Sequence, residues 1–356
     1  MTKLERLRNK LNEKGIDAVV ILDELNQRYL SDFAFTDGLL LITKNHAELI
    51  TDFRYYEMAG KEADKEYNIV MPEKRFEYIS DILESDSCKT IGFEGDSVSY
   101  NTYISYKDKL NNFEFVNIGD TVEELRKIKT PEEIKIMQKA QDITDKAFSH
   151  ILNVLTPSMT EIEVAAELEY VMRRCGADSC AFDTIAVSGD ASSLPHGTPR
   201  NVKLKSGFLT MDYGAKYKGY CSDMTRTVVI GKADADMKKL YNTVLNAQRS
   251  AMEYLREAAD MGEADKIARD IIDSHDEYKG AFGHSLGHSI GLYIHESPGL
   301  SKKWFGEKMK IGEIFTVEPG IYLFGKYGCR IEDMVAVEKD GIYNFTHSTK
   351  ELIEII

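Results

Sequence analysis

The sequence has few cysteines, few prolines and no long apolar run. Its 356 residues include five cysteines, an odd number without any Cys-x-x-Cys pair. This usage indicates a reducing compartment and argues against a disulfide framework or a thiolate zinc site. No apolar stretch approaches the ~18–20 residues that span a bilayer, and residues 1–15 predict a charged amphipathic helix instead of a signal segment. We therefore expect a cytoplasmic protein with no membrane partner.

Positive charge is also in deficit. The chain has 59 acidic and 45 basic residues, for a net charge of −14, which repels phosphate backbones and excludes nucleic acid as an expected partner. Hydrophobic residues at 43% and charged residues at 29% are typical of a globular protein. At about 150 residues per domain, the length suits about two domains. The seven prolines form no linker, and no fixed-period repeat is present.

Helices and strands alternate in the first segment, which predicts an α/β domain over residues 1–125. The expected helices are 2–14, 54–66, 76–85 and 102–110, and the expected strands are 17–22, 38–43, 47–52, 67–71, 90–94 and 114–117. A strong helix start follows, with Thr130 as the N-cap, Pro131 in the first turn and acids after it. We place the domain boundary just before it.

The second domain is expected over residues 126–356. Helices are predicted at 131–155, 160–176, 235–257 and 262–275, and the segments after each pair of helices are rich in strand-forming residues. Because helices and strands come in blocks here, we predict an α+β fold.

Asp212 and Asp223 are acids embedded in apolar strand sequence. Two strands are predicted, 208–213 and 220–230, joined by a glycine-bounded loop. If the bounding glycines pair, Asp212 lies opposite Cys221 and diagonal to Asp223, so the carboxylates share one face about 7–8 Å apart. A one-residue change of register would separate them. Alone, the pair fits an ordinary hairpin with two surface acids equally well.

Three histidines fall within a glycine-rich segment, residues 283–296. His284 and His288 are four residues apart, but Ser285 stands where the HExxH zinc motif requires Glu. The glycines would each also destabilise a helix by about 1 kcal/mol. We therefore expect a turn that runs into a strand, with His295 at its end. A purely structural role for a single histidine stays open.

Two glutamates stand at the ends of apolar strands in the last 50 residues. Glu318 follows the run 314–317 and precedes Pro319, which cannot donate to a sheet and therefore ends the pairing. Glu332 follows a similar strand that contains Arg330. Charges in such places are unfavourable unless they are paired or bound to metal. Singly, each glutamate also fits a surface charge on an edge strand.

Together these motifs supply four carboxylates and one imidazole: Asp212, Asp223, His288, Glu318 and Glu332. This oxygen-rich set suits divalent manganese, cobalt, iron or zinc. Five ligands are too many for one catalytic ion with an open position, whereas two ions about 3.5–4 Å apart use them all. Without metal, the four negative charges would repel each other and protonate or separate. We expect two divalent ions per chain, with manganese favoured.

The five motifs, MDYG, SDMTRT, HSLGHSIGL, TVEPGIY and RIED, resemble in order and spacing those of the pita-bread metallopeptidases, particularly the Xaa-Pro group of aminopeptidase P and prolidase. The segment TDFRY at 51–55 looks like part of that group's creatinase-type N-terminal domain. The resemblance therefore covers nearly the whole chain. It implies a creatinase-type domain, a pita-bread catalytic domain, and a homodimer in which one N-terminal domain helps to close its neighbour's active site.

The resemblance also implies how the ligands divide between the metals. Asp212 would bind one ion, His288 and Glu318 the other, and Asp223 and Glu332 would bridge both.

Four more residues match positions near the metals and the substrate in the same family: His196, His284, His295 and Arg330. Glu318 is the expected proton shuttle. His284 and His295 are expected to stabilise the oxyanion and orient the scissile carbonyl.

The implied reaction is hydrolysis of the bond before proline at the N-terminus of a small peptide, by a hydroxide that bridges the two metals. Methionine aminopeptidases use the same ligands but usually lack the creatinase-type domain. Creatinase shares the architecture without the metal ligands. An inactive peptide-binding module of this fold typically loses ligands, and none is missing here; it remains the alternative of a different class.

Two activities within the Xaa-Pro group stay open. Prolidases often carry an arginine shortly after the HE-x-P stretch, where it can hold the free carboxylate of a dipeptide. Residues 295–303 are HESPGLSKK, with glycine at that position, which favours an aminopeptidase that accepts longer peptides. Because Lys302 or Lys303 could supply the charge instead, a Xaa-Pro dipeptidase remains the alternative.

Overall fold

A mixed six-stranded sheet, in the order β4-β3-β2-β1-β5-β6, is the centre of the first of two units, residues 1–126 of a computed structural model that describes all 356 residues. Strand β1 pairs antiparallel with β2 and parallel with β5. The elements of this unit are α1 (Lys3–Glu13), β1 (Ala18–Ile21), α2 (Glu24–Ser31), β2 (Leu39–Thr43), β3 (Ala47–Ile50), α3 (Phe53–Glu62), β4 (Asn68–Val70), α4 (Arg75–Ser85), β5 (Thr90–Phe93), α5 (Tyr100–Lys109), β6 (Glu114–Asn117) and α6 (Thr121–Arg126). The predicted α/β class is confirmed.

Strands β1 and β2 are apolar apart from Thr43 because both faces of the sheet are covered, and every residue of the two strands is buried. Helix α2 was not predicted from the sequence. Its N-cap Asp23 accepts hydrogen bonds from two backbone amides, but the buried polar residues Asn26 and Gln27 interrupt the apolar periodicity that would have indicated it. The short helix α6 was missed as well.

The second unit, residues 127–356, holds a four-stranded sheet, β20-β12-β9-β8, and a five-stranded sheet, β14-β13-β15-β18-β19. Two smaller sheets have the orders β11-β10-β7 and β16-β17. The helices of this unit are α7 (Pro131–Val154), α8 (Glu161–Arg174), α9 (Ala235–Tyr254) and α10 (Met261–Asp273). Its strands are β7 (Ser179–Cys180), β8 (Ile185–Ser188), β9 (Gly207–Tyr213), β10 (Ala215–Tyr217), β11 (Tyr220–Cys221), β12 (Met224–Ile230), β13 (Gly287–Ser289), β14 (Glu296–Leu300), β15 (Ile314–Val317), β16 (Gly320–Leu323), β17 (Tyr327–Arg330), β18 (Asp333–Val337), β19 (Ile342–Asn344) and β20 (Glu354–Ile355).

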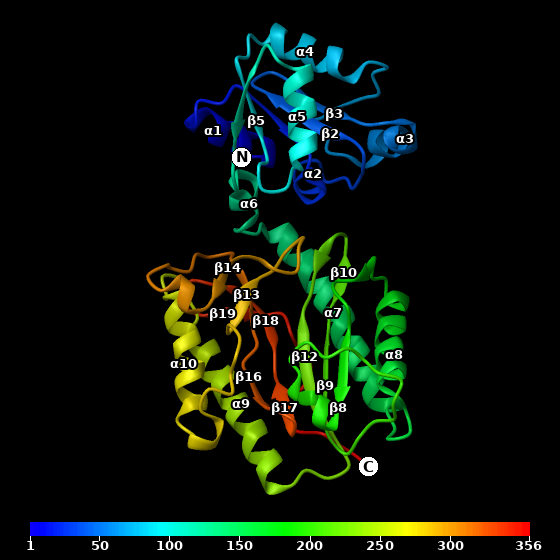
Figure 1. Ribbon diagram of the computed structural model, residues 1–356, viewed down its shortest axis with the longest axis vertical. Coiled ribbons are helices and arrows are strands. Elements are labelled where there is room, and N and C mark those ends of the chain that lie inside the picture. Colours follow the sequence, from blue (N-terminus) through cyan, green and yellow to red (C-terminus); the bar gives the residue numbers. More distant parts are fainter. The chain divides into compact units, whose positions relative to one another are not determined.

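Two helix pairs enclose the strands of the second unit (Figure 1). Helices α7 and α8 lie on one side and pack on β9 and β12, where Phe148 and Leu168 share a core with Leu209. Helices α9 and α10 lie on the other side and pack on β15 and β18, where Val244 shares a core with Phe315. This arrangement confirms the α+β prediction and leaves the ends of the strands to carry the polar residues.

Helix α7 begins where the sequence predicts. Thr130 is the N-cap and forms a reciprocal capping box with Glu133, and Pro131 occupies the first turn. None of the helices combines the length and the apolar character that a membrane span requires.

Candidate metal centre

Asp212 and Asp223 lie on one face of the β9–β12 hairpin. Asp212 pairs with Thr225, so Asp223 is its diagonal neighbour. The predicted partner of Asp212, Cys221, is wrong by four residues, because the hairpin extends through β10 and β11 to a two-residue turn at 218–219 whose φ angles are both positive. Since four is an even shift, the two carboxylates still share a face, as predicted.

His288 lies in β13, between Asp223, which precedes β12, and Glu318, which follows β15. Its Nε2 lies 3.5 Å from Asp223 Oδ2 and 3.5 Å from Glu318 Oε1. Glu318 follows the last residue of β15, and Pro319 separates it from β16, as the sequence predicts. Glu332 completes the group, since ligand atoms of Asp223, His288 and Glu332 all lie within 4.8 Å of one another.

The histidine segment forms no helix around His284 and His288, in agreement with the rejection of an HExxH motif. The strand expected to end at His295 is wrong in its position, because the strand here is β13, at 287–289, and residues 290–295 form an irregular loop before β14. Gly291 explains part of this path, because a Cβ there would lie 2.6 Å from Glu296 Oε2.

Two threonines orient the expected ligands. Thr225 Oγ1 donates a hydrogen bond to Glu332 Oε2 at 2.6 Å, and Thr316 Oγ1 donates to Glu318 Oε1 at 3.1 Å. These threonines were not among the site residues predicted from the sequence. A signal was present, because each threonine lies two positions from an acid on a strand, Thr225 from Asp223 and Thr316 from Glu318, and therefore on the same face.

The carboxylates destabilise one another as anions. Burial, followed by repulsion from Asp212 and Glu318, raises the pKa of Asp223 well above its usual range. Burial and then Asp223 do the same to the pKa of Glu332, and burial raises the pKa of Glu318. Oδ1 of Asp212 and Oδ1 of Asp223 are buried without a hydrogen-bond partner. Unpartnered, mutually repelling oxygens fit divalent cations, which would supply both the missing contact and the opposite charge.

A hydrogen-bonded chain leads from Asp212 to His284. Arg330 donates from Nη2 to Asp212 Oδ2 at 2.5 Å and from Nη1 to the Tyr322 hydroxyl at 2.7 Å. The hydroxyl lies 3.0 Å from His284 Nε2, and His284 Nδ1 lies 2.9 Å from the Ser285 carbonyl. Burial lowers the pKa of His284 to about 4, so the neutral ring donates from Nδ1 and accepts at Nε2. Both ring nitrogens of His284 are therefore engaged.

Tyr322 is a site residue that sequence analysis missed. Burial raises its pKa to about 12, which keeps the hydroxyl protonated and able to donate to His284 while it accepts from Arg330. Its signal in the sequence was weak, because a tyrosine in an apolar strand is more often a packing residue.

A cavity of about 370 Å³ collects every site residue predicted from the sequence. Those residues are His196, Asp212, Asp223, His284, His288, His295, Glu318, Arg330 and Glu332. The His295 ring lies 4.4 Å from the ring of His288, centroid to centroid. Apolar side chains, Phe182, Ile185 and Ile294, form part of the wall, and Arg330 is the only lysine or arginine that lines it.

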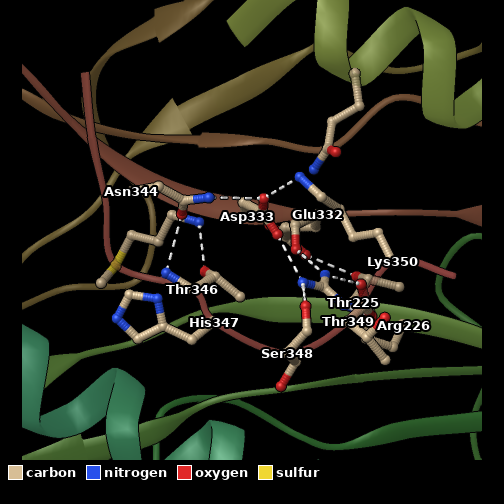
Figure 2. Close-up of polar contacts among 12 residues, drawn as sticks. Thr225, Arg226, Glu332, Asp333, Asn344, Thr346, His347, Ser348, Thr349 and Lys350 are labelled. Atoms are coloured by element: carbon tan, nitrogen blue, oxygen red, sulfur yellow. Dashed lines mark hydrogen bonds and ion pairs between the residues drawn. The ribbon is translucent and has the colours of Figure 1, made fainter.

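A second buried ion pair holds the backbone of Glu332, and neither of its residues lines the cavity (Figure 2). Arg226 Nη2 lies 2.7 Å from Asp333 Oδ1, and Arg226 Nη1 donates to the Glu332 carbonyl at 2.6 Å. Lys350 Nζ lies 2.5 Å from the other oxygen of Asp333. Although burial opposes it, attraction to Arg226 and Lys350 holds the pKa of Asp333 below its ordinary value. The backbone of Glu332 is thereby tied to the last residues of the chain.

Both parts of the chain match known families. The family described as Metallopeptidase family M24 matches residues 135–339, and the Creatinase/Prolidase N-terminal domain matches residues 3–128. A Xaa-Pro dipeptidase of Pyrococcus furiosus is 38% identical over 353 residues, which cover 99% of each chain.

Solved structures are similar over the whole chain. A Xaa-Pro dipeptidase from Bacillus anthracis has a TM-score of 0.94 at 42% identity, with 99% of both chains covered. An X-Pro aminopeptidase from Thermotoga maritima has a TM-score of 0.92 at 34% identity, covering 98% of this chain and 100% of that one. The chain therefore belongs to metallopeptidase family M24, among its Xaa-Pro peptidases, with a creatinase-type N-terminal domain and a pita-bread catalytic domain.

Proposed function

We propose that this chain holds two divalent cations and hydrolyses the bond before proline at the N-terminus of small peptides, with longer peptides preferred over dipeptides. The observation that carries the proposal is the convergence of four carboxylates and one imidazole on one cavity, where two carboxylate oxygens are buried without partners. A peptide-binding module without activity would have no need of this costly group of charges.

The proposed ligands are Asp212, Asp223, His288, Glu318 and Glu332. Their oxygen-rich chemistry suits manganese best, and cobalt, zinc and iron also fit. When bound, such cations lower the pKa of water and polarise a carbonyl oxygen.

Glu318 is the proposed proton carrier. The bond before proline is a tertiary amide, so the proline nitrogen leaves only when it receives a proton. Glu318 lines the cavity, where its carboxylate can take up a proton from the attacking water and deliver it to that nitrogen. Thr316 donates to Glu318 Oε1 and restrains the carboxylate.

The histidines divide the remaining work. His196 and His295 line the cavity and form no hydrogen bond within the chain, so their ring nitrogens are available to orient the scissile carbonyl. The ring of His284 is engaged by Tyr322 and Ser285. We therefore assign His284 to holding the Tyr322 hydroxyl, in place of the direct oxyanion contact expected from the sequence.

The preference for longer peptides rests on charge. A dipeptidase needs a cation for the free carboxylate of its substrate. Arg330, the only lysine or arginine that lines the cavity, is committed to Asp212 and Tyr322. Lys302 and Lys303 do not line it. Because the relatives carry both names, dipeptidase action remains the second candidate.

The test uses the whole protein, stripped of metal and reloaded with manganese. Elemental analysis should find about two ions per chain. The release of the first residue is then compared for Ala-Pro, Ala-Pro-Ala and the proline-free control Ala-Ala-Ala. We expect cleavage of Ala-Pro-Ala above that of Ala-Pro and none of Ala-Ala-Ala. No cleavage of either proline peptide would contradict the proposed function, and a strong preference for Ala-Pro would replace it by the dipeptidase. Sedimentation velocity on the same sample tests the expected homodimer.

A further inference from the structure

Helix α10 carries an ion pair that points away from solvent and toward the segment that bears His284. Asp265 is fully buried, and Arg269, one turn later, has 19% of its side chain exposed. The pair is bidentate, with Arg269 Nε 3.1 Å from Asp265 Oδ2 and Nη2 2.9 Å from Oδ1. Neither residue lines the cavity. The pair can therefore affect the site only through the backbone segment to which it is hydrogen-bonded.

Arg269 holds the backbone on both sides of Gly283. Its Nη1 donates to the Phe282 carbonyl at 2.6 Å, and its Nη2 donates to the His284 carbonyl at 2.9 Å. The guanidinium also lies over the Phe282 ring, 4.4 Å from its centroid. A planar fork of donors can make these contacts together, whereas a lysine ammonium cannot.

Asp265 fixes the far end of the same segment. Its Oδ1 accepts a hydrogen bond from the Leu286 amide at 3.0 Å. The Leu286 carbonyl in turn accepts from the Glu318 amide at 2.8 Å, and the Ala281 carbonyl accepts from the Tyr322 amide at 3.1 Å. The backbone segment that carries His284 is thus hydrogen-bonded to the backbones of Glu318 and Tyr322.

Phe282 and Leu286 are buried in the core on either side of His284, but the residues between them have little packing of their own. Gly283 and Ser285 are exposed, and a Cβ on Gly283 would meet no atom within 4 Å. The ring of His284 nevertheless has to keep Nε2 against the Tyr322 hydroxyl, which also receives Arg330. The ion pair supplies backbone hydrogen bonds at this exposed stretch, where the ring of His284 must keep a fixed position.

We propose that the Asp265–Arg269 pair is a positioning device that sets the His284 ring, and through it Tyr322 and Arg330, for peptide hydrolysis. The proposal rests on the proposed function, because it assigns the pair a part in that reaction. It assigns Asp265 and Arg269 no contact with metal or substrate.

The same helix offers a matched control. Lys266 and Asp270 form an ion pair of the same i,i+4 spacing on α10, with 52% and 62% of their side chains exposed. A change there alters the charge pattern and helical propensity of α10 without touching the His284 segment.

The kinetic experiment compares Arg269→Lys with Lys266→Gln in the manganese-loaded enzyme, with Ala-Pro-Ala as substrate. For Arg269→Lys we expect kcat to fall about 10–100-fold, since a displacement of about 1 Å can cost about 10²-fold. KM and metal content should stay close to those of the unaltered enzyme, and the melting temperature should fall but stay above the assay temperature. Lys266→Gln should leave all four quantities unchanged. An Arg269→Lys enzyme with unchanged kcat would overturn the proposal.

A double-variant comparison separates positioning from a general structural role. If Arg269 acts through His284, Arg269→Lys should lower kcat by no more than about threefold in an enzyme that already carries His284→Ala, because coupled residues are not additive. The same fold-loss in both backgrounds would contradict the proposal. If Arg269→Lys does not fold, Asp265→Asn, which keeps the shape and removes the charge, takes its place in both comparisons.

A spectroscopic measurement makes the inference independent of turnover. In a proton–nitrogen spectrum of the histidine rings, assigned with His284→Ala, Arg269→Lys should shift the His284 ring signals and Lys266→Gln should not. An unmoved His284 signal overturns the positioning role even if the enzyme is active. An unaltered chain that cleaves no proline peptide overturns the proposed function, while the ring signals still decide whether Arg269 holds His284.

Discussion

Arg330 and Asp212 form a buried ion pair inside the candidate metal centre, with 4% and 12% of their side chains exposed. Because the guanidinium occupies Oδ2 of Asp212, only Oδ1 is left without a partner. Arg330 therefore determines which oxygen of Asp212 is open to a cation. The same guanidinium donates to the Tyr322 hydroxyl. One side chain therefore links Asp212, on the metal side of the cavity, to Tyr322, on the histidine side.

Replacing Arg330 by lysine should uncouple these two sides. Arg330→Lys keeps the charge but cannot reach Asp212 and Tyr322 together. We expect kcat/KM for Ala-Pro-Ala to fall about 10²-fold, since misplacement on this scale costs about that much. Arg249→Lys, at an exposed position of α9, is the control and should be unaffected. Equal kcat/KM in the two variants would mean that catalysis does not require Arg330 to bind Asp212 and Tyr322 together.

Asp223→Ala should remove activity and metal together. Asp223 is the expected bridging ligand. Its Oδ2 lies 3.5 Å from His288 Nε2, and ligand atoms of Asp223, His288 and Glu332 lie within 4.8 Å of one another. Elemental analysis after dialysis should find fewer metal ions per chain than a dinuclear centre would hold, which is about two. Asp340→Ala, in an exposed turn, should keep both. Retained turnover in Asp223→Ala would refute its assignment as a bridging ligand.

Metal removal should destabilise the protein more at high pH than at low pH. In the metal-free chain the pKa values of Asp223 and Glu332 are raised by burial and mutual repulsion. The folded state therefore holds protons that the unfolded state has released, and its stability is lost as pH rises through these raised values. Metal binding requires the deprotonated form, so its affinity rises over the same range.

The measurement is the melting temperature with manganese and with a chelator, from about pH 5 to about pH 8, a range that begins above the ordinary carboxyl pKa. The melting temperature with manganese should exceed that with the chelator by a larger amount as pH rises. Asp223→Asn combined with Glu332→Gln removes both titrating groups and should flatten the curve. A difference that narrows with pH would show that these carboxylates do not hold the metal.

The local signals in the sequence were sufficient for much of the fold. Thr130 and Pro131 mark the start of α7, and Pro319 marks the end of the strand before Glu318. The two aspartates were placed on one face although the register was wrong, since the error was an even number of residues. Helix α2 was missed because its buried Asn26 and Gln27 donate hydrogen bonds to Glu94 and to the Ile21 carbonyl, contacts that no local pattern reveals.

The supports of the site were harder to predict than its ligands. Acids in apolar strands are conspicuous, so the sequence alone indicated the carboxylates and His288. The Asp265–Arg269 pair has the spacing of an ordinary surface pair, and Lys266–Asp270 on the same helix is one. Burial separates the two pairs, and burial depends on which face of α10 meets the segment before β13. That is a property of the assembled fold.

The buried pair of Arg226 and Asp333 offers a last test of how the centre is supported. Asp333→Ala would leave Arg226, fully buried with five hydrogen bonds to surrounding acceptors, without its counter-ion. Breaking such a pair destabilises a protein by about 3–5 kcal/mol. Asp190→Ala breaks the exposed pair with Lys205 and should destabilise the protein far less, because exposed ion pairs contribute little to stability.

Urea unfolding, followed by tryptophan fluorescence, measures the difference in the right part of the chain. Trp304 is the only tryptophan and lies in the second unit, so its signal reports the unit that contains both pairs. A chelator in both samples removes any contribution from metal. If Asp333→Ala shifts the midpoint no more than Asp190→Ala, the network in Figure 2 does not stabilise the fold, and its hydrogen bond to the Glu332 carbonyl cannot be what holds that glutamate in place.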